Sequence, residues 1–270
     1  MRRLMCVLAH PDDESLGMGG ALAKYAAEGV ETYVVTATKG ERGRSGSAEP
    51  LTPEAVGRLR HAELHAAARE LGVREVSLLG YPDGDLDQAN PAEATARIVA
   101  HLRRVKPHVV LTFGPDGAYG HPDHIAISQF TTAAVVCAAD PNYEHHDYPE
   151  PHRVSKLYYL AWRADKWASY QAALRKLAVT VDGVERRATP WPDWAVTTVI
   201  ETSAFLAQVW RAVSCHESQM AIYRQLSHLS EEHHRCLWGS QEFYRALSLV
   251  NGGRRVESDL FEGLHGGNIT

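Results

Sequence analysis

The chain has 270 residues, a formal net charge of −5 and 44% hydrophobic residues. This charge excludes the basic surface that is typical of nucleic-acid-binding proteins, so we expect no nucleic-acid partner. No window reaches the roughly 20 apolar residues that a membrane-spanning helix needs, and the N-terminus lacks a signal-peptide pattern. We therefore expect a cytoplasmic protein. Since its four cysteines form no CxxC pair, we expect reduced structural thiols.

Segments typical of strands and helices alternate through the first 140 residues. Short apolar runs predict strands, and segments of helical periodicity between them predict helices. The predicted strands are 4–9, 31–37, 76–79 and 109–113, and the predicted helices are 16–28, 53–71, 91–105 and 125–139. Alternation at this spacing predicts parallel β-α-β units with right-handed crossovers. The expected fold is α/β and Rossmann-like, a mainly parallel twisted sheet with helices on both faces.

The pattern after residue 140 is less regular. Residues 141–151 form a polar loop rich in His, Tyr and Pro. Later strands are expected at 157–161 and 196–200, antiparallel or at an edge of the sheet, and a helical pattern that allows for a break runs from about 203 to 232. We therefore expect a more irregular C-terminal third.

No internal repeat or linker divides the chain, so we expect a single domain over residues 1–270. Residues 1–140 would hold the α/β core, and residues 141–270 would complete a pocket and the C-terminal elements. Residues 190–194 read Pro-Trp-Pro-Asp-Trp. This stretch is compatible with the interface of a homo-oligomer, with a lid over the pocket, or with ordinary packing against the core.

Two short polar motifs each follow a predicted strand and lie roughly 110 residues apart. Residues 9–14 read Ala-His-Pro-Asp-Asp-Glu, and residues 121–124 read His-Pro-Asp-His. Open α/β sheets build their sites at strand ends, so we expect the motifs to meet at one edge of the sheet. One His-Pro-Asp alone is more often a capped turn, but two of them after strands are hard to explain by coincidence. Their imidazoles and carboxylates indicate a metal-dependent hydrolase.

His10, Asp13 and His124 are the predicted metal ligands, because two imidazoles and one carboxylate leave an open position for water on Zn²⁺. A metal there would lower the pKa of that water and polarise a carbonyl group. Asp12 and its neighbour Asp13 are not expected to aim at the same point, so we assign Asp12 as the general base. His121 is placed to stabilise an oxyanion or to protonate the leaving amine.

Three further residues receive supporting roles. Asp123 is expected to orient an imidazole from behind the ligands. Glu14 is expected to cap the following helix, since carboxylates suit a first turn. His216 is expected to be a packed or hydrogen-bonded histidine, because the metal already has three ligands.

The motifs resemble the LmbE-like, or PIG-L, family of zinc-dependent N-acetylglucosaminyl deacetylases. The resemblance rests on residues 9–14 and 119–124, on Thr-Lys-Gly-Glu-Arg-Gly at 38–43, on Arg-His-Ala-Glu-Leu at 60–64 and on Gly-Tyr-Pro-Asp-Gly at 80–84. It covers the first half of the chain in family order, and the second half matches mainly in His-Glu-Ser-Gln at 216–219.

The resemblance implies the same ligands, the same base and the same acid as the chemistry above. It adds Tyr119 as a donor on the oxyanion side, and it implies sugar contacts from Glu41, Arg60 and Asp83. The residues by themselves also allow plainer interpretations. Glu41 suits a solvated loop, Arg60 the exposed face of a helix, Asp83 a turn, and Tyr119 a half-buried loop.

The expected reaction is hydrolysis of an amide, in which Asp12 deprotonates a water activated by the metal and the products are acetate and a free amine. The resemblance points to a small-molecule N-acetylglucosamine conjugate as substrate and to Zn²⁺ as cofactor, with Fe²⁺ as the alternative metal. A second hypothesis is an amidase that cleaves a larger thiol-conjugate, antibiotic or lipid-linked amide. A third is a sugar- or metal-binding protein that has lost catalysis, against which Asp12 and His121 argue.

Overall fold

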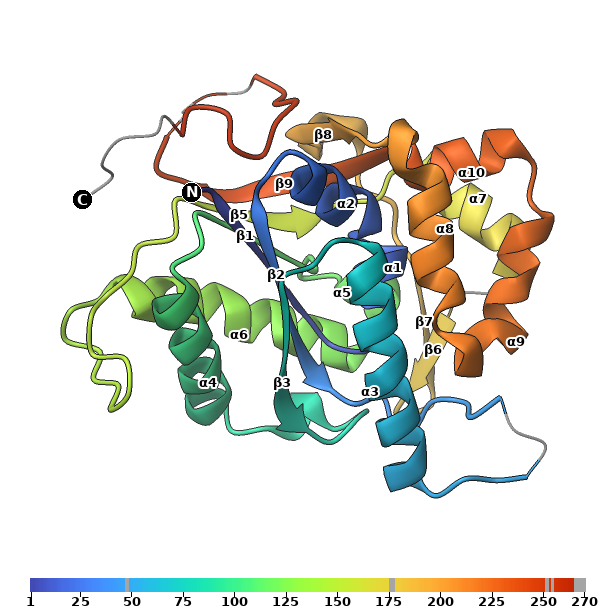
Figure 1. Cartoon of the computed structure of the whole chain (residues 1–270), viewed down its shortest axis with the longest axis horizontal. Helices are drawn as coiled ribbons and strands as arrows, with labels where there is room; N and C mark the ends of the chain where they lie inside the picture. The colour runs from blue at the N-terminus through green and yellow to red at the C-terminus, as the bar shows by residue number, and fades with distance from the viewer. Residues whose placement is uncertain (47–48, 175–177, 251–252, 254, 265–270) are drawn as a thin grey trace.

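Seven strands form one mixed sheet in the order β3-β2-β1-β4-β5-β9-β8 (Figure 1). The computed structural model describes residues 1–46, 49–174, 178–250, 253 and 255–264. The strands of the sheet are β1 Arg3–Leu8, β2 Glu31–Thr38, β3 Glu75–Tyr81, β4 Val109–Thr112, β5 Lys156–Leu160, β8 Thr198–Glu201 and β9 Ser240–Ser248. Strands β1 to β5 are parallel, and β9 runs antiparallel to both β5 and β8. The predicted α/β fold with a mainly parallel sheet is confirmed.

Helices connect the strands and cover the sheet. They are α1 Asp13–Leu16, α2 Gly19–Ala27, α3 Pro53–Glu70, α4 Pro91–Val105, α5 Gly117–Gly120, α6 Pro122–Ala139, α7 Ala164–Leu174, α8 Leu206–Ser214, α9 Met220–Tyr223 and α10 Glu231–Trp238. Helices α4 and α6 pack together on one face, and α2, α3 and α8 pack together on the other. A separate hairpin joins β6 Ala178–Val181 to β7 Val184–Arg187. Within the described residues, no helix is long and apolar enough to cross a membrane.

Side-chain caps determine where helices α3 and α4 begin. The Thr52 hydroxyl accepts a hydrogen bond from the Ala55 amide before α3, and the Asn90 side chain accepts from the amides of Ala92 and Glu93 before α4. A proline follows each of these caps, where its missing N–H costs no hydrogen bond. These signals explain why the predicted starts at residues 53 and 91 are correct.

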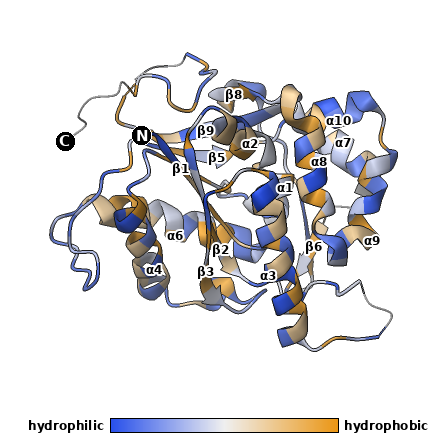
Figure 2. Ribbon diagram, viewed as in Figure 1, coloured by the Kyte–Doolittle hydropathy of each residue, from blue (hydrophilic) through white to orange (hydrophobic). Residues whose placement is uncertain are grey.

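The core lies between the central strands and the inner faces of the helices. Strands β1, β2 and β4 are buried almost end to end, as expected for parallel strands that are covered on both faces. Figure 2 shows apolar residues on the strands and inward helix faces, and hydrophilic residues on the outer helix faces.

The strand order creates the crevice that holds the site. The chain runs from β1 outward to β2 and β3, and then returns to place β4 on the other side of β1. Ligands of open α/β sheets bind at such a reversal, outside the carboxyl ends of the strands. Both sequence motifs follow strands at this point, since the first comes directly after β1 and the second lies just beyond β4.

The structure corrects several boundaries. The predicted helix 16–28 is two helices, α1 and α2, separated at Gly17 and Met18. The helical pattern from 203 to 232 is broken into α8, α9 and the start of α10, with short 3₁₀ turns between them. Strand β9 was not expected, because two polar residues stand at its start. Gln241 and Glu242 are buried there, although their polarity favours the surface.

The stretch 190–194 contains two tryptophans in different settings. The Trp191 indole N–H donates to Asp116 Oδ1 at 3.3 Å, so this ring packs against the loop after β4. Trp194 is 87% exposed. Packing therefore accounts for Trp191, while a homo-oligomer interface or a lid over the pocket formed by this stretch stays a prediction. All four cysteines are free thiols.

Candidate active site

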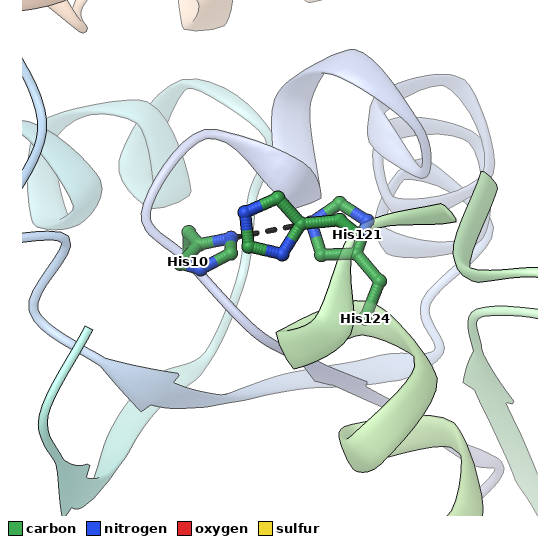
Figure 3. A group of neighbouring side chains, drawn as sticks. All are labelled: His10, His121 and His124. Carbon is green, nitrogen blue, oxygen red and sulfur yellow. Dashed lines mark hydrogen bonds between the residues drawn. The ribbon is translucent and has the colours of Figure 1, made fainter. Parts of the chain in front are cut away.

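Both sequence motifs contribute to one cavity of about 490 Å³ at the carboxyl ends of β1 and β4. Eight of the nine site residues predicted from the sequence line its wall: His10, Asp12, Asp13, Arg60, Asp83, Tyr119, His121 and His124. The ninth, Glu41, is not part of the described wall. Figure 3 shows three imidazoles converging here, one from the loop after β1 and two from the start of α6.

Two imidazole nitrogens and one carboxylate meet at the centre of the cavity. His10 Nδ1 lies 3.2 Å from His124 Nε2 (Figure 3). Asp13 Oδ1 lies 3.5 Å from His124 Nε2, and Asp13 Oδ2 lies 3.8 Å from His10 Nδ1. The backbone amides of Ala9 and His10 donate to Asp13 Oδ2, so Oδ1, which lies beside His124, is the oxygen left for a cation. This donor set fits a divalent metal such as Zn²⁺, which prefers imidazole and carboxylate ligands.

The far nitrogen of His10 is held by two carboxylates. His10 Nε2 lies 3.0 Å from Asp123 Oδ2 and 3.1 Å from Asp83 Oδ1. The backbone amides of Gly84 and Leu86 donate to Asp123 and fix it in turn. Burial alone would lower the pKa of His10, but the hydrogen bonds from His10 to Asp123 and Asp83 outweigh it and raise that pKa to about 10. A carboxylate behind an imidazole typically orients a metal ligand and fixes its tautomer.

His121 belongs to the same group of imidazoles. Ligand nitrogens of His10, His121 and His124 lie within 4.8 Å of one another, and so do ligand atoms of His10, Asp83 and Asp123. His121 is the N-cap of α6, and its Nδ1 accepts a hydrogen bond from the Asp123 amide at 3.2 Å. Burial and the charge of His10 lower the pKa of His121 to about 4. The geometry thus offers His121 both as a third imidazole ligand and as a group beside the metal.

Asp12 sits in a strained backbone conformation with φ 108°, which costs a non-glycine residue on the order of 1–3 kcal/mol. Two donors hold its carboxylate, because Arg60 Nη2 and the Tyr223 hydroxyl reach Asp12 Oδ2 at 2.8 and 2.6 Å. Its backbone amide donates to Glu14 Oε2 at 2.8 Å. Among the described residues, no donor reaches Asp12 Oδ1, so this oxygen keeps its lone pairs for a ligand.

The Arg60 guanidinium is buried, and both of its terminal nitrogens donate to protein oxygens. Its Nη1 donates to the Gly40 carbonyl at 2.8 Å, and its Nη2 also donates to the Pro11 carbonyl at 2.5 Å. Gly40 has φ +65°, and a Cβ there would lie 2.0 Å from Arg60 Nη1. The glycine is therefore required for the arginine to tie the loop after β2 to the first motif.

Asp83 and Glu41 form a second link between loops. Asp83 Oδ2 accepts from the Arg42 amide at 2.9 Å, and Glu41 Oε1 accepts from the Asp83 amide at 3.0 Å. Burial would raise the pKa of Asp83, but the hydrogen bond and charge of His10 outweigh it and lower that pKa to about 2. Glu41 thus supports the loop after β3 from behind the cavity.

Tyr119 lies in a tight loop and faces the imidazoles. Its neighbours Ala118 and Gly120 have φ of 64° and 82°. The Tyr119 ring centroid is 5.5 Å from that of His124 and 5.8 Å from that of His121. Burial raises the pKa of the Tyr119 hydroxyl, which keeps it protonated and able to donate a hydrogen bond at neutral pH.

Sequence reasoning missed part of the site that the C-terminal third supplies. Tyr223 had no motif to mark it, yet its hydroxyl bonds to Asp12 from 211 residues away. Glu14, expected as a helix cap, is completely buried and does bond to the Asp12 amide, but it also pairs with His216 Nε2 at 2.8 Å. The motif at 216–219 was the available signal for this contact.

Comparison with known proteins places the chain in a family. Residues 5–135 match the PIG-L family, described as GlcNAc-PI de-N-acetylase. The 1D-myo-inositol 2-acetamido-2-deoxy-alpha-D-glucopyranoside deacetylase of Rhodococcus jostii (strain RHA1) is 39% identical and covers 82% of both chains. The protein of the same name from Streptomyces griseus is 35% identical and covers 97% of this chain and 89% of its own.

Solved structures share the fold. N,N'-diacetylchitobiose deacetylase from Pyrococcus horikoshii has a TM-score of 0.67 at 20% identity, covering 90% of this chain and 83% of its own. GalB, the 4-carboxy-2-hydroxymuconate hydratase from Pseudomonas putida KT2440, has a TM-score of 0.66 at 20% identity, covering 94% of this chain and 99% of its own. One fold carries both reactions, so the fold alone does not decide the chemistry. The sequence identity to the two deacetylases does decide it: the chain belongs to the PIG-L family and is a deacetylase.

Proposed function

We propose that this protein uses a divalent metal to remove the acetyl group from N-acetylglucosamine linked to an inositol-like polyol. The main observation behind this proposal is the contact of His10 Nδ1 with His124 Nε2 at 3.2 Å. The Asp13 carboxylate lies beside both nitrogens. The relatives named above support the substrate, because they are named as deacetylases of such a conjugate.

His10 Nδ1, His124 Nε2 and Asp13 Oδ1 would hold the metal. When bound, the metal would lower the pKa of a water molecule and polarise the substrate carbonyl. Asp83 and Asp123 accept the ring proton at Nε2, so Nδ1 is the nitrogen that would bind the metal. Because the pKa of His10 is raised to about 10, the metal would displace the proton that Nδ1 carries in the metal-free protein. The donor set fits Zn²⁺, with Fe²⁺ as the alternative.

Asp12 is the proposed general base. Its Oδ1 would take the proton of the attacking water, while Arg60 and Tyr223 hold the carboxylate through Oδ2. A positioned base of this kind typically contributes about 10²- to 10⁴-fold in rate. Arg60, for which the family resemblance implied a sugar contact, is proposed here as a positioning residue, and Glu41 likewise supports Asp83.

His121 and Tyr119 are proposed to act on the other side of the amide. His121 Nε2 would donate a hydrogen bond to the oxyanion that forms on the carbonyl, since its Nδ1 accepts from the Asp123 amide and its lowered pKa keeps the ring neutral at pH 7. The proton that Asp12 takes from the water would then pass to the leaving nitrogen. The Tyr119 hydroxyl would donate to the oxyanion that forms on the carbonyl. Asp83 keeps its role as a sugar contact, because it lines the cavity.

The proposal is tested by acetate release from an N-acetylglucosamine–inositol conjugate, N-acetylglucosamine and larger N-acyl amides. Metal-stripped protein would be assayed with and without Zn²⁺ or Fe²⁺. We expect metal-dependent release that is lost in Asp12→Asn but kept in Asp87→Asn, an exposed carboxylate outside the cavity. Metal binding without acetate release would overturn the substrate and favour the larger amide, and failure to bind metal would overturn the ligand assignment.

A further inference from the structure

Two histidines on α3 face each other outside the cavity. His61 and His65 are four residues apart on this helix, a spacing that brings side chains to the same face. Both are half-buried, and neither lines the cavity that the two motifs build. Their Nε2 atoms lie 3.1 Å apart, and their ring centroids lie 4.6 Å apart at an interplanar angle of 77°. Each ring thus turns one nitrogen toward the same small space.

The separation of these two nitrogens suits a single bound metal ion. Imidazole nitrogen binds such an ion at about 2.0–2.1 Å, so two of them on one ion lie about 2.9 Å apart at a right angle and about 3.3 Å apart at a tetrahedral angle. The observed 3.1 Å falls between these two values. It is also close to the 3.2 Å between His10 Nδ1 and His124 Nε2 at the proposed metal site.

No other group holds these nitrogens in place. Among the described residues, the contact between the two rings is the one hydrogen bond that His61 and His65 make. That bond needs a proton on one Nε2, while the other Nε2 accepts. An ion between the rings would take the place of this proton, which would move to Nδ1 of its own ring. Both imidazoles would stay neutral, and no other bond of the fold would break.

The charges around the pair keep His61 neutral and also limit its affinity for a cation. Burial, followed by the neighbouring His65 and Lys39, lowers the pKa of His61 below its ordinary value. The ring is therefore unprotonated at neutral pH, as a metal ligand must be. Lys39 is exposed, and its positive charge opposes a second cation nearby.

We propose that His61 and His65 form a second metal site, which takes a divalent ion of the first transition series such as Ni²⁺, Cu²⁺ or Zn²⁺. These ions favour imidazole, whereas Mg²⁺ and Ca²⁺ favour oxygen ligands. With two protein ligands, water would fill the remaining positions, and the ion would bridge one turn of α3. Arg60, which holds the Asp12 carboxylate, precedes His61 directly on this helix. The bound ion would thus stabilise the helix that carries Arg60.

The probe is Ni²⁺, whose binding is measured by calorimetry on the wild type, His61→Gln, His65→Gln and the double variant. We expect the wild type to bind one more Ni²⁺ per chain than each variant does. Because one ion needs both rings, each single variant should already show the full loss that the double variant shows. His146→Gln is the matched control, since this histidine is exposed outside any helix, and it should bind Ni²⁺ as the wild type does.

Three further measurements place the ion. Ni²⁺ should raise the midpoint of urea unfolding more in the wild type than in His65→Gln, because an ion that binds the folded chain stabilises it. Lys39→Gln should strengthen Ni²⁺ binding, since it removes a nearby positive charge. Acetate release by the metal-loaded enzyme should be the same in His65→Gln and the wild type. All the variants keep the residues of the cavity, so failure of this inference is distinguishable from failure of the proposed function.

Three outcomes would overturn the inference. One is equal Ni²⁺ binding by the wild type and His65→Gln. Another is a partial loss in each single variant that adds up in the double variant, which would make the two rings separate weak sites. The last is Ni²⁺ binding that Lys39→Gln leaves unchanged or weakens, which would place the ion away from α3.

Discussion

Two buried clusters of charged side chains lie at opposite edges of the sheet and differ in charge balance. The first surrounds Glu257 near the start of β5. Lys156 Nζ and Arg245 Nη1 contact Glu257 Oε1 at 2.7 and 2.8 Å, and the hydroxyls of Tyr158 and Thr198 donate to Oε2 at 2.7 and 3.0 Å. Two cations and two hydroxyls thus satisfy a single carboxylate.

The second cluster is the candidate site at the carboxyl ends of the strands. It gathers four buried carboxylates, those of Asp12, Asp13, Asp83 and Asp123. Among the described residues, the one guanidinium that bonds to them is Arg60. Imidazoles, the Tyr223 hydroxyl and backbone amides provide the remaining contacts. Buried charge is stable only when it is paired. The comparison teaches that the chain surrounds a carboxylate with cations where it anchors a segment, and leaves negative charge in excess at the proposed metal site.

The largest effect should come from Asp13→Asn. The asparagine oxygen can still accept the amides of Ala9 and His10, so the loop is expected to keep its shape. The substitution removes a ligand, and metal affinity should fall by more than the roughly 10–100-fold that loss of a supporting outer group costs. Metal content after gel filtration measures this loss.

Asp13→Asn also tests whether the four buried carboxylates of the site carry an excess of negative charge. Because one of four crowded carboxylates is removed, metal-free Asp13→Asn should unfold at a urea concentration equal to or above that of the metal-free wild type. A clear fall in the midpoint would contradict the idea that the cluster carries surplus negative charge.

His121→Gln separates the two geometric roles of His121. If His121 stabilises the oxyanion, kcat should fall by about 10²- to 10³-fold while metal content stays at one ion per chain. His124→Gln is the matched comparison from the same helix turn, and it should lose the metal. Equal loss of metal in both variants would make His121 a ligand and move the oxyanion contact to another group.

Glu257→Gln should lower stability and leave activity unchanged, which is the opposite of the result expected for Asp13→Asn. Breaking a buried pair leaves Lys156 and Arg245 without their carboxylate, at a cost of about 3–5 kcal/mol in the free energy of unfolding. The activity of the folded fraction should stay unchanged, because the cluster lies at the other edge of the sheet. Urea unfolding measures the first effect, and Glu150→Gln is the control, since its exposed pair with Lys106 contributes little.

The stability difference between wild type and Glu257→Gln should depend on pH with a definite sign. Burial would raise the pKa of Glu257, but the hydrogen bonds from Lys156 and Tyr158 outweigh it and lower that pKa below 4.5. A carboxyl group with a lowered pKa in the folded state stabilises the protein above its unfolded pKa and loses this effect as the pH falls through its folded pKa. The stability gap between wild type and Glu257→Gln should therefore narrow on acidification below pH 4.5. A gap that widens would contradict the pairing.

The elements that could be predicted are those determined by residues close to one another in the sequence. The apolar runs before the two motifs gave β1 and β4 to within a residue or so, and His10 and His124 followed from the motifs at their ends. Local caps placed α3 and α4. Since parallel strands end at one edge, the meeting of two motifs 110 residues apart also followed from the pattern.

The part that could not be predicted depends on partners from distant segments. Gln241 looks like a surface residue, but inside β9 its oxygen accepts from the Ala21 amide and its amide donates to the Gly17 carbonyl. Glu242 is buried because Lys166 Nζ lies 2.8 Å away. Polar residues of this kind hide a strand from any pattern of hydrophobicity.

Tyr223→Phe is expected to give the smallest effect, and it asks whether the C-terminal third takes part in catalysis or only encloses the cavity. The phenyl ring keeps the packing and removes one hydrogen bond to the Asp12 carboxylate, which is worth about 1.5–3 kcal/mol for a charged group. Arg60 still holds that carboxylate at 2.8 Å, so kcat should fall by about tenfold, at the weak end of this range, with KM and metal content unchanged. Steady-state kinetics on the metal-loaded enzyme measures it. A change in KM alone would assign Tyr223 to the wall of the cavity, and would confine the chemistry to the two motifs at the ends of β1 and β4.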